Sequence, residues 1–311
     1  MIIQHRGYDH SCSPNTKIFC SELGTNISSL HPKALDMELK TNLRKMRTHL
    51  DNDGIAQYLL PLYDVLDYSH NVSVNSWIGK NITITYRGQI HCVETGKLIK
   101  KTFGEGLSYD AFLRSPLASP SIIRPELSRI HEGIALRDEA WEREHHLVPH
   151  YVYLSKTSHI KVGVTRVGNV PSRWIDQGAT EAIVLAETPY RQLAGLIEVA
   201  LKDTLSDKTS WQAMLKNTIA EDVSLLQKKH EIADVLPQEL QDYISDDDKV
   251  HHIQFPVEEY PVKVKSVKLD DLTEYTNRLV GIKGQYLIFE QGHVLNIRSH
   301  AGYQVHFTLS D

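Results

Sequence analysis

Tyr151-Val-Tyr-Leu154 and Lys161-Val-Gly-Val-Thr-Arg166 open the stretch that decides the fold, residues 151–211. Both runs are rich in β-branched or aromatic residues, which predicts two strands. Arg173 follows in a turn, and residues 190–205 then carry apolar side chains three and four positions apart, as a helix does. The order strand, strand, arginine, helix predicts a small α/β core.

Five regions of the chain differ in their sequence pattern. Residues 1–36 are polar and show no sustained period, so we predict a flexible extension. Residues 37–147 have the pattern of a β-rich domain, 148–216 that of the α/β core, and 217–252 that of a helical connector. Residues 253–311 carry strand-like runs joined by glycine turns, which predict an antiparallel β domain. The predicted fold class is α+β, with a central three-stranded core flanked by two β domains.

Two local patterns make specific predictions within the β regions. Arg87-Gly88 is predicted to end a strand over 81–86 and to lead into its hairpin partner over 89–93. Val262-Lys-Val-Lys265 alternates, so we predict a strand whose two lysines lie on the face opposite its two valines.

Composition and charge limit the class of protein. The 311 residues are 41% hydrophobic and 23% charged, as in an ordinary globular protein. Net charge is −5, so contact with nucleic acid must use local basic patches. No apolar run reaches the roughly 18–20 residues of a membrane span, and the first residues lack the apolar core of a secretory signal. Three cysteines are too few for a disulfide framework, so we predict a cytoplasmic protein without a membrane partner.

Tyr153, Arg173 and Glu198 are chemically suited to cleave a phosphodiester. Such cleavage needs a divalent cation to neutralise developing charge, and Glu198 supplies a carboxylate that can hold Mg²⁺. The guanidinium of Arg173 can grip a phosphate through two hydrogen bonds. The hydroxyl of Tyr153 can act as a general base or can orient the nucleophile.

A purely structural interpretation of the same residues stays open. Glu198 and Lys202 are four positions apart on a predicted helix and can pair on its surface. Tyr153 shares one strand face with another tyrosine two positions earlier, as core aromatic residues often do. Arg173 precedes a tryptophan, on which it can stack.

Four lysines are candidates for contact with a nucleic-acid backbone. Lys202 lies one helical turn beyond Glu198, whereas Lys263, Lys265 and Lys268 lead into the C-terminal strands. Lysines along such a face neutralise phosphates regardless of base sequence. The alternative is an ordinary solvated face.

The order and spacing of the central residues resemble the GIY-YIG nuclease superfamily. Tyr153 lies where the first motif of that family has a tyrosine, and Gly163 matches the glycine of the second motif. Arg173 matches the arginine of the family's helix, and Glu198 matches its metal-binding glutamate. The resemblance implies a small three-stranded sheet flanked by helices, and hydrolysis of DNA with one magnesium ion.

Two positions depart from that superfamily. Lys161 replaces the tyrosine of the second motif, as in a phage-type branch with a Lys-Ile-Gly motif, and Gln177 stands where many members have a histidine. A lysine can grip phosphate, but it is cationic at neutral pH unless it is buried. The resemblance therefore implies Tyr153, Lys161 and Arg173 as the catalytic residues and Glu198 as the metal ligand.

From Leu43 to Phe307 the sequence also resembles an uncharacterised bacterial family, domain of unknown function 2797. The motifs that carry this resemblance are Asn42-Leu-Arg-Lys-Met46, Trp77-Ile-Gly-Lys80, Gly88-Gln-Ile-His-Cys92, Pro149-His-Tyr-Val-Tyr-Leu154, Arg173-Trp-Ile-Asp-Gln-Gly-Ala179, Ser206-Asp-Lys-Thr-Ser-Trp211 and Gly281-Ile-Lys-Gly-Gln-Tyr286.

That family usually carries a run of cysteines that look like zinc ligands, of which Cys92 remains here. The other positions hold Thr95, Ser108, Ala111, Ser121, Ser128 and His146. One thiolate and scattered hydroxyls cannot make a tetrahedral thiolate site, so we expect no structural zinc. The alternative is a residual metal site made by Cys92 with His145, His146 and His150.

Two functions of different classes follow. The first is a metal-dependent nuclease that cleaves nucleic acid with Mg²⁺. The second is a non-catalytic nucleic-acid-binding or interaction protein that keeps the fold. Retention of Tyr153, Arg173 and Glu198 favours the first, whereas Lys161 and the lost cysteines favour the second. Convergence of these four side chains on one concave, accessible face would favour an enzyme.

Overall fold

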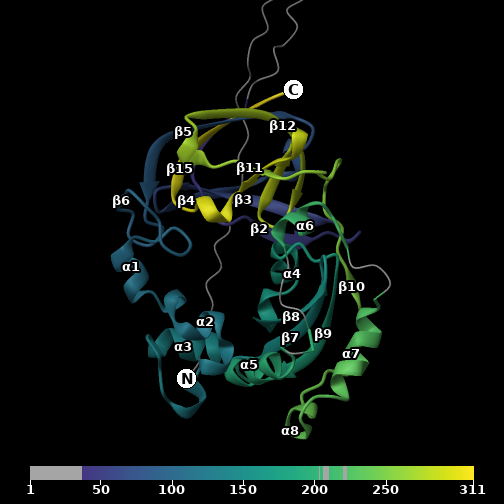
Figure 1. Ribbon diagram of the computed structural model, residues 1–311. Helices are drawn as coiled ribbons and strands as arrows, with labels where there is room; N and C mark the ends of the chain where they lie inside the picture. Colours follow the sequence, from purple (N-terminus) through teal and green to yellow (C-terminus); the bar gives the residue numbers. More distant parts are fainter. Residues whose placement is uncertain (1–36, 203, 206–209, 220–222) are drawn as a thin grey trace, which may run out of the picture. The chain divides into compact units, whose positions relative to one another are not determined.

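The computed structural model describes residues 37–202, 204–205, 210–219 and 223–311 (Figure 1). The extension predicted over 1–36 lies outside these residues. Both helices and strands are present, as the predicted α+β class requires. The α-helices in the described part are α1 (Tyr109–Arg114), α2 (Pro120–Ile123), α3 (Glu139–His146), α4 (Ser172–Asp176), α5 (Arg191–Ala200), α6 (Trp211–Leu215), α7 (Leu225–Ala233) and α8 (Gln238–Gln241).

The strands of the described residues form three sheets. The largest has the order β1 (Met37–Asn42), β15 (Tyr303–Ser310), β5 (Asn81–His91), β12 (Glu274–Lys283), β13 (Tyr286–Phe289), β14 (His293–Asn296), β11 (Lys265–Ser266), with β6 (Leu98–Ile99) beside β5. The second has the order β10 (His251–His252), β9 (Glu181–Thr188), β7 (His150–Lys156), β8 (Ile160–Arg166). The third has the order β2 (Arg47–Leu50), β3 (Ala56–Asp64), β4 (Asp67–Ser73).

The largest sheet combines strands from both β regions of the chain. β1 pairs with β15, β15 with β5, and β5 with β12, all antiparallel. β5 and β15 alternate buried and exposed residues, and their pairing sets Ile82 opposite Leu309 and Ile84 opposite Phe307. Because that pairing buries a shared apolar face, the two β regions predicted as separate domains contribute strands to one sheet.

The predicted hairpin at Arg87-Gly88 is wrong. β5 continues through both residues, and its pairing with β15 shifts register between Tyr303 and Val305. Gly88 has a φ of +79°, in the left-handed region. A single left-handed glycine inside a paired strand makes a bulge that bends the strand, whereas a hairpin needs a reversal of the chain.

The strand predicted over 262–265 is also wrong. In this region only Lys265–Ser266 pairs, and it runs parallel to β14, so the C-terminal strands are not all antiparallel. Val262 is 85% exposed and does not lie on a buried face opposite the lysines. The backbone of Lys263 packs instead on Gly292, where an added Cβ would lie 1.8 Å from the Lys263 carbonyl oxygen. The segment is therefore positioned by a close backbone contact with a turn.

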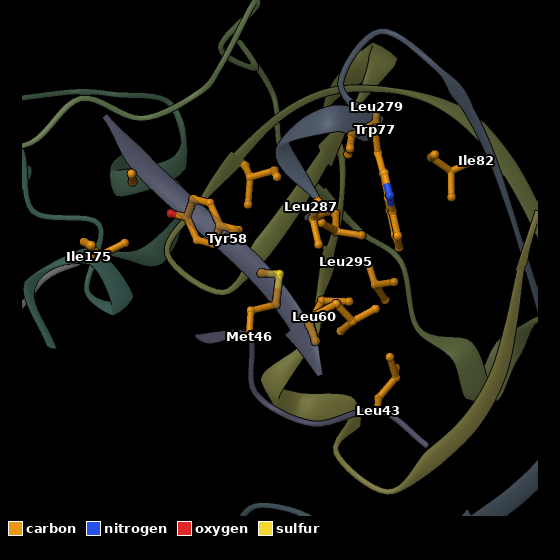
Figure 2. Close-up of a cluster of buried hydrophobic side chains, with 14 of the residues drawn as sticks. Leu43, Met46, Tyr58, Leu60, Trp77, Ile82, Ile175, Leu279, Leu287 and Leu295 are labelled. Atoms are coloured by element: carbon orange, nitrogen blue, oxygen red, sulfur yellow. The ribbon is translucent and has the colours of Figure 1, made fainter. Parts of the chain in front are cut away.

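The main hydrophobic core lies between the large sheet and the strands β2 and β3. Figure 2 shows this cluster, in which Trp77, Leu287 and Leu295 lie with Tyr58 of β3. Ile175 of α4 belongs to the same cluster, so the core reaches from the large sheet to the central segment. This shared core fixes α4, which carries Arg173.

A buried glutamine reinforces the same connection. The amide nitrogen of Gln285 donates to the carbonyl oxygen of Met46 at 3.1 Å and to Asp176 Oδ1 at 2.8 Å. Its amide oxygen accepts from the backbone N–H of Met46 at 2.8 Å. Three satisfied hydrogen bonds on one buried amide connect the β12–β13 turn, the segment before β2, and α4.

The central sheet has β7 between β8 and β9, with the two-residue β10 at the edge. A three-stranded sheet was predicted, and the sheet has four strands because the short β10 joins three long ones. α5 lies within the predicted helix over 190–205. Leu193 and Ile197 of α5 pack on Val152 and Leu154 of β7 in a second core. Tyr153 points from the opposite face of β7 into the main core.

Candidate functional site

A cleft of about 570 Å³ opens beside β8, α4 and α5. That volume lies within the range of ligand sites, roughly 300–1,000 Å³. Lys161, Arg173 and Glu198, which are far apart in the sequence, all line it. The remaining lining residues include Lys45, Leu117, Ile122, Ile123, Pro125, Trp141, His145, His146, Gly163, Arg166, Asp176, Gln177 and Arg191.

Tyr153 does not line the cleft, because it lies buried behind β8. Gly163 is directly opposite Tyr153 in the β7–β8 pair, and a Cβ at Gly163 would lie 2.6 Å from the tyrosine hydroxyl oxygen. The hydroxyl donates to Gln177 Oε1 at 2.9 Å. The glycine therefore leaves the space that the tyrosine side chain occupies.

The buried position decides the protonation state of Tyr153. Burial raises its pKa above the ordinary value near 10, and hydrogen bonding to Arg173 and Gln177 only partly opposes this effect. The phenol is therefore neutral at physiological pH and acts as a hydrogen-bonding group. Of the two roles predicted from sequence, orientation of neighbouring groups fits this position and general base catalysis does not.

Three arginines and a single glutamate line the cleft, namely Arg166, Arg173, Arg191 and Glu198. Arg191 donates from Nε to the Ser121 carbonyl and from Nη2 to the Ile122 carbonyl, both at 2.9 Å. Burial is the main cause that lowers the Arg191 pKa; Glu198 raises it, the positive charges of Arg173 and Arg166 lower it, and the net pKa is about 10. These mutual effects place the three guanidinium groups and the Glu198 carboxylate within electrostatic range of one another.

Sequence reasoning missed Arg166 and Arg191. Arg191 is the first residue of α5, so its positive charge lies at the positive end of the helix dipole. An arginine in that unfavourable position indicates that its side chain has another partner, and this signal can be recognised in the sequence. Arg166 at the end of β8 has no comparable signal, because strands often end in a charged residue.

Two carboxylates, Asp176 and Glu198, line the cleft and differ in their fit to a magnesium ion. Asp176 is ion-paired with Lys45 and accepts from Gln285, and its side chain is 2% exposed, so it serves the fold. Within the described residues no cluster of three or more His, Cys, Asp or Glu side chains could hold a metal. Mg²⁺ is often held by one or two carboxylates with waters and substrate phosphates. The residues present therefore fit Mg²⁺ only in this form, with Glu198 as the protein ligand.

None of the four lysines predicted to contact nucleic acid lines this cleft. Lys202 lines a neighbouring cleft of about 530 Å³ that it shares with Glu198. Lys263 and Lys265 line a separate cleft of about 330 Å³, and Lys268 is exposed but lines neither. The structure therefore brings Lys202 near the candidate site and does not bring the C-terminal lysines into it.

The residues at the lost cysteine positions form two separate groups. Cys92 is buried with Leu107 and Ala111, and its Sγ accepts from the backbone N–H of Ser108 at 3.2 Å. Burial raises the Cys92 pKa, but hydrogen bonds led by the Thr95 side chain outweigh it and lower the pKa to about 7.

His146 belongs to the other group and bonds Ser128 Oγ at 3.2 Å. The alternative metal site joining Cys92 to His145, His146 and His150 is wrong, since no such group of three ligands exists in the described part of the chain.

Two buried histidines are expected to make the stability of the folded protein depend on pH. Burial lowers the pKa of His146 to about 3 and that of His150 to about 4, against about 6.5 in an unfolded chain. Below about pH 6.5 the unfolded chain binds protons at these histidines that the folded protein does not bind. Stability therefore falls as the pH falls from about 6.5 towards about 4. We expect the double variant His146→Gln/His150→Asn to lose part of this decline in melting temperature between pH 7 and 4.5.

The exposed His306 provides the control for that measurement. The His306→Gln variant should show the same decline in melting temperature as the parent protein, because His306 is exposed and the two buried histidines are unchanged in it. An unchanged decline in the double variant would show that other groups cause it.

The fold and cleft define an α+β protein with a cationic site that contains one glutamate. The chain belongs to the family described as protein of unknown function (DUF2797), whose model matches residues 79–305. Neither the curated proteins nor the solved structures give a significant match. None of the helices in the described residues combines the length and apolar content needed to cross a bilayer.

Proposed function

We propose that this protein is a metal-dependent phosphodiesterase with a GIY-YIG-like core that acts on nucleic acid. One observation carries the proposal: Lys161, Arg173 and Glu198 line the same cleft as Arg166 and Arg191. Several cations in one cleft with the Glu198 carboxylate suit a phosphate together with a divalent ion that this carboxylate holds. The overall charge of −5 makes this local excess of positive charge more informative.

Each residue has a role in this proposal. Arg173 binds the scissile phosphate through its guanidinium, and Lys161 contributes a further positive charge at the same phosphate. Tyr153 positions the neighbouring groups, since its hydroxyl donates to Gln177 and its pKa responds to the charge of Arg173. Glu198 would hold Mg²⁺, which when bound would neutralise developing charge and activate a water. We propose no structural zinc, because hydroxyl and apolar side chains stand at the other ligand positions around Cys92.

The proposal is tested by nicking of supercoiled plasmid and labelled oligonucleotides by the full chain. Activity should require Mg²⁺ and disappear with a chelator. The Arg173→Ala variant should lose about a hundredfold or more in rate, because removal of one donor to a developing anion has that effect. Arg143→Ala provides the matched control, since Arg143 is an exposed arginine paired with Glu139 on α3. Equal rates in the parent and Arg173→Ala proteins would reject the proposal.

The second candidate is a nucleic-acid-binding protein without catalysis. It is favoured by Lys161, which replaces an ionisable hydroxyl of the superfamily with a cation. A cationic cleft binds phosphates even when it lacks a group to activate water. Binding to DNA or RNA in the presence of chelator, with no cleavage on addition of Mg²⁺, would select this function over the first.

The C-terminal lysines give a separate prediction about binding. We expect the triple variant Lys263→Ala/Lys265→Ala/Lys268→Ala to bind all sequences more weakly, with a flatter dependence of affinity on salt and unchanged sequence preference. The reason is that these exposed lysines would neutralise phosphates without reading bases. A salt titration of affinity measures the effect, and an unchanged slope would assign these lysines to an ordinary solvated surface.

A further inference from the structure

A stacked aromatic pair lines one side of the arginine cleft. Trp141 and His145 of α3 have ring centroids 4.1 Å apart and planes 9° apart, and both side chains line the cleft. Both residues are only partly buried. Aromatic surface therefore faces the space in which the arginines would bind phosphate.

Several contacts hold this pair in place. Asp138 caps α3 by accepting from the backbone N–H of Trp141 at 2.9 Å. The Nδ1 of His145 donates to the Trp141 carbonyl oxygen at 2.9 Å. The ring of His146 meets the indole edge-on, with centroids 5.3 Å apart. Rings that are fixed before binding lose little conformational entropy when a ligand stacks on them.

Two exposed apolar side chains also line the cleft. Leu117 and Ile123 line the cleft and are 58% and 87% exposed. The segment that carries them is held to α5 by Arg191, through the carbonyl groups of Ser121 and Ile122. Positive charge and exposed aromatic and apolar side chains thus occur in one cleft, and this combination matches a nucleotide, which has an anionic phosphate and a flat base.

We infer that a nucleobase of the bound strand stacks on the Trp141–His145 pair while its phosphate lies among Arg166, Arg173 and Arg191. This inference rests on the proposed function and adds the substrate class. A base inside a duplex is already stacked and paired, so it reaches an aromatic side chain only after it is unpaired. The preferred substrate is therefore single-stranded nucleic acid, or a duplex with an unpaired base.

The test measures binding of the full chain to a labelled single strand and to its duplex, in chelator so that no cleavage occurs. The single strand should bind more tightly. Trp141→Ala should weaken single-strand binding by about five- to a hundredfold, as loss of one stacked base does. Trp141→Phe should keep most of the affinity, because it preserves an aromatic face. Trp211→Ala provides the control, since Trp211 stacks on Tyr286 and lines neither this cleft nor its neighbour.

The outcomes separate this inference from the proposed function. If Arg173→Ala weakens binding to both nucleic acids and Trp141→Ala and His145→Ala weaken neither, stacking is overturned and the phosphate cleft stands. If none of the three variants changes affinity, both proposals fail. Equal affinity for single strand and duplex overturns the substrate class. If a free mononucleotide competes for the cleft as well as the strand does, the ligand is not a nucleic-acid strand.

Discussion

Glu198→Gln is expected to abolish magnesium-dependent nicking while leaving the fold intact. Glu198 is the carboxylate that we propose holds Mg²⁺. Asp176 cannot take over this role, because it is paired with Lys45 and Gln285. Metal-held charge contributes several kcal/mol to such a transition state, so its loss lowers the rate by about a hundredfold or more. The amide keeps the size of the side chain and removes its negative charge. The rate of plasmid nicking at saturating Mg²⁺ measures the effect.

Glu187→Gln is the matched control for that variant. Glu187 is an exposed glutamate of β9 that does not line the cleft. The Glu187→Gln variant should therefore nick plasmid at the rate of the parent protein. Melting temperatures of the parent and both variants show whether the fold is retained. If the Glu198→Gln protein nicks DNA or RNA at the parental rate, Glu198 does not hold the metal.

Gly195→Ala is expected to destabilise the protein and to disturb the wall of the cleft. Gly195 lies inside α5, where glycine is normally about 1 kcal/mol less favourable than alanine. Here an added Cβ would lie 2.2 Å from the backbone nitrogen of Glu126 and 2.6 Å from the carbonyl carbon of Pro125. Because both atoms belong to the backbone, the 125–126 segment must move. The expected loss of unfolding free energy is about 1–3 kcal/mol, as for other overpacked sites.

Pro125 of the displaced segment lines the cleft, so the same variant should weaken ligand binding. Urea unfolding measures the stability, and Gly168→Ala serves as the control, since no atom lies within 4 Å of its added Cβ. Equal or greater stability of Gly195→Ala would mean that α5 and the 125–126 segment do not approach as closely as described. Unchanged binding by a destabilised variant would assign Gly195 to the fold alone.

Local sequence patterns predicted the central segment well. The β-branched and aromatic residues of β7 and β8 and the helical spacing in α5 depend on neighbours only a few positions apart, so the sequence itself carries the signal. The strand-like runs of residues 253–311 likewise include strands of the structure, among them β13 and β15. Convergence of Tyr153, Lys161, Arg173 and Glu198 on one face would favour an enzyme, and three of the four, all except Tyr153, line one cleft.

The sequence misled where one local signal fits two structures. Gly88 looked like the turn of a hairpin, but a left-handed glycine also makes a bulge within a paired strand. The alternation in Val262-Lys-Val-Lys265 suggested a strand, but its backbone packs on Gly292. A strand needs partners for its hydrogen bonds, and the alternation of side chains does not show whether a partner is near.

By itself the sequence determined the elements of the central segment and the residue types that suit phosphate chemistry, because both depend on short-range spacing. Only the tertiary structure decided that the two β regions share a sheet, since strand pairing across more than 200 residues follows from which apolar faces bury each other. It also placed Tyr153 behind Gly163 and brought Arg191 and the Trp141–His145 pair to the cleft. These positions depend on packing between distant segments, and no local pattern encodes them.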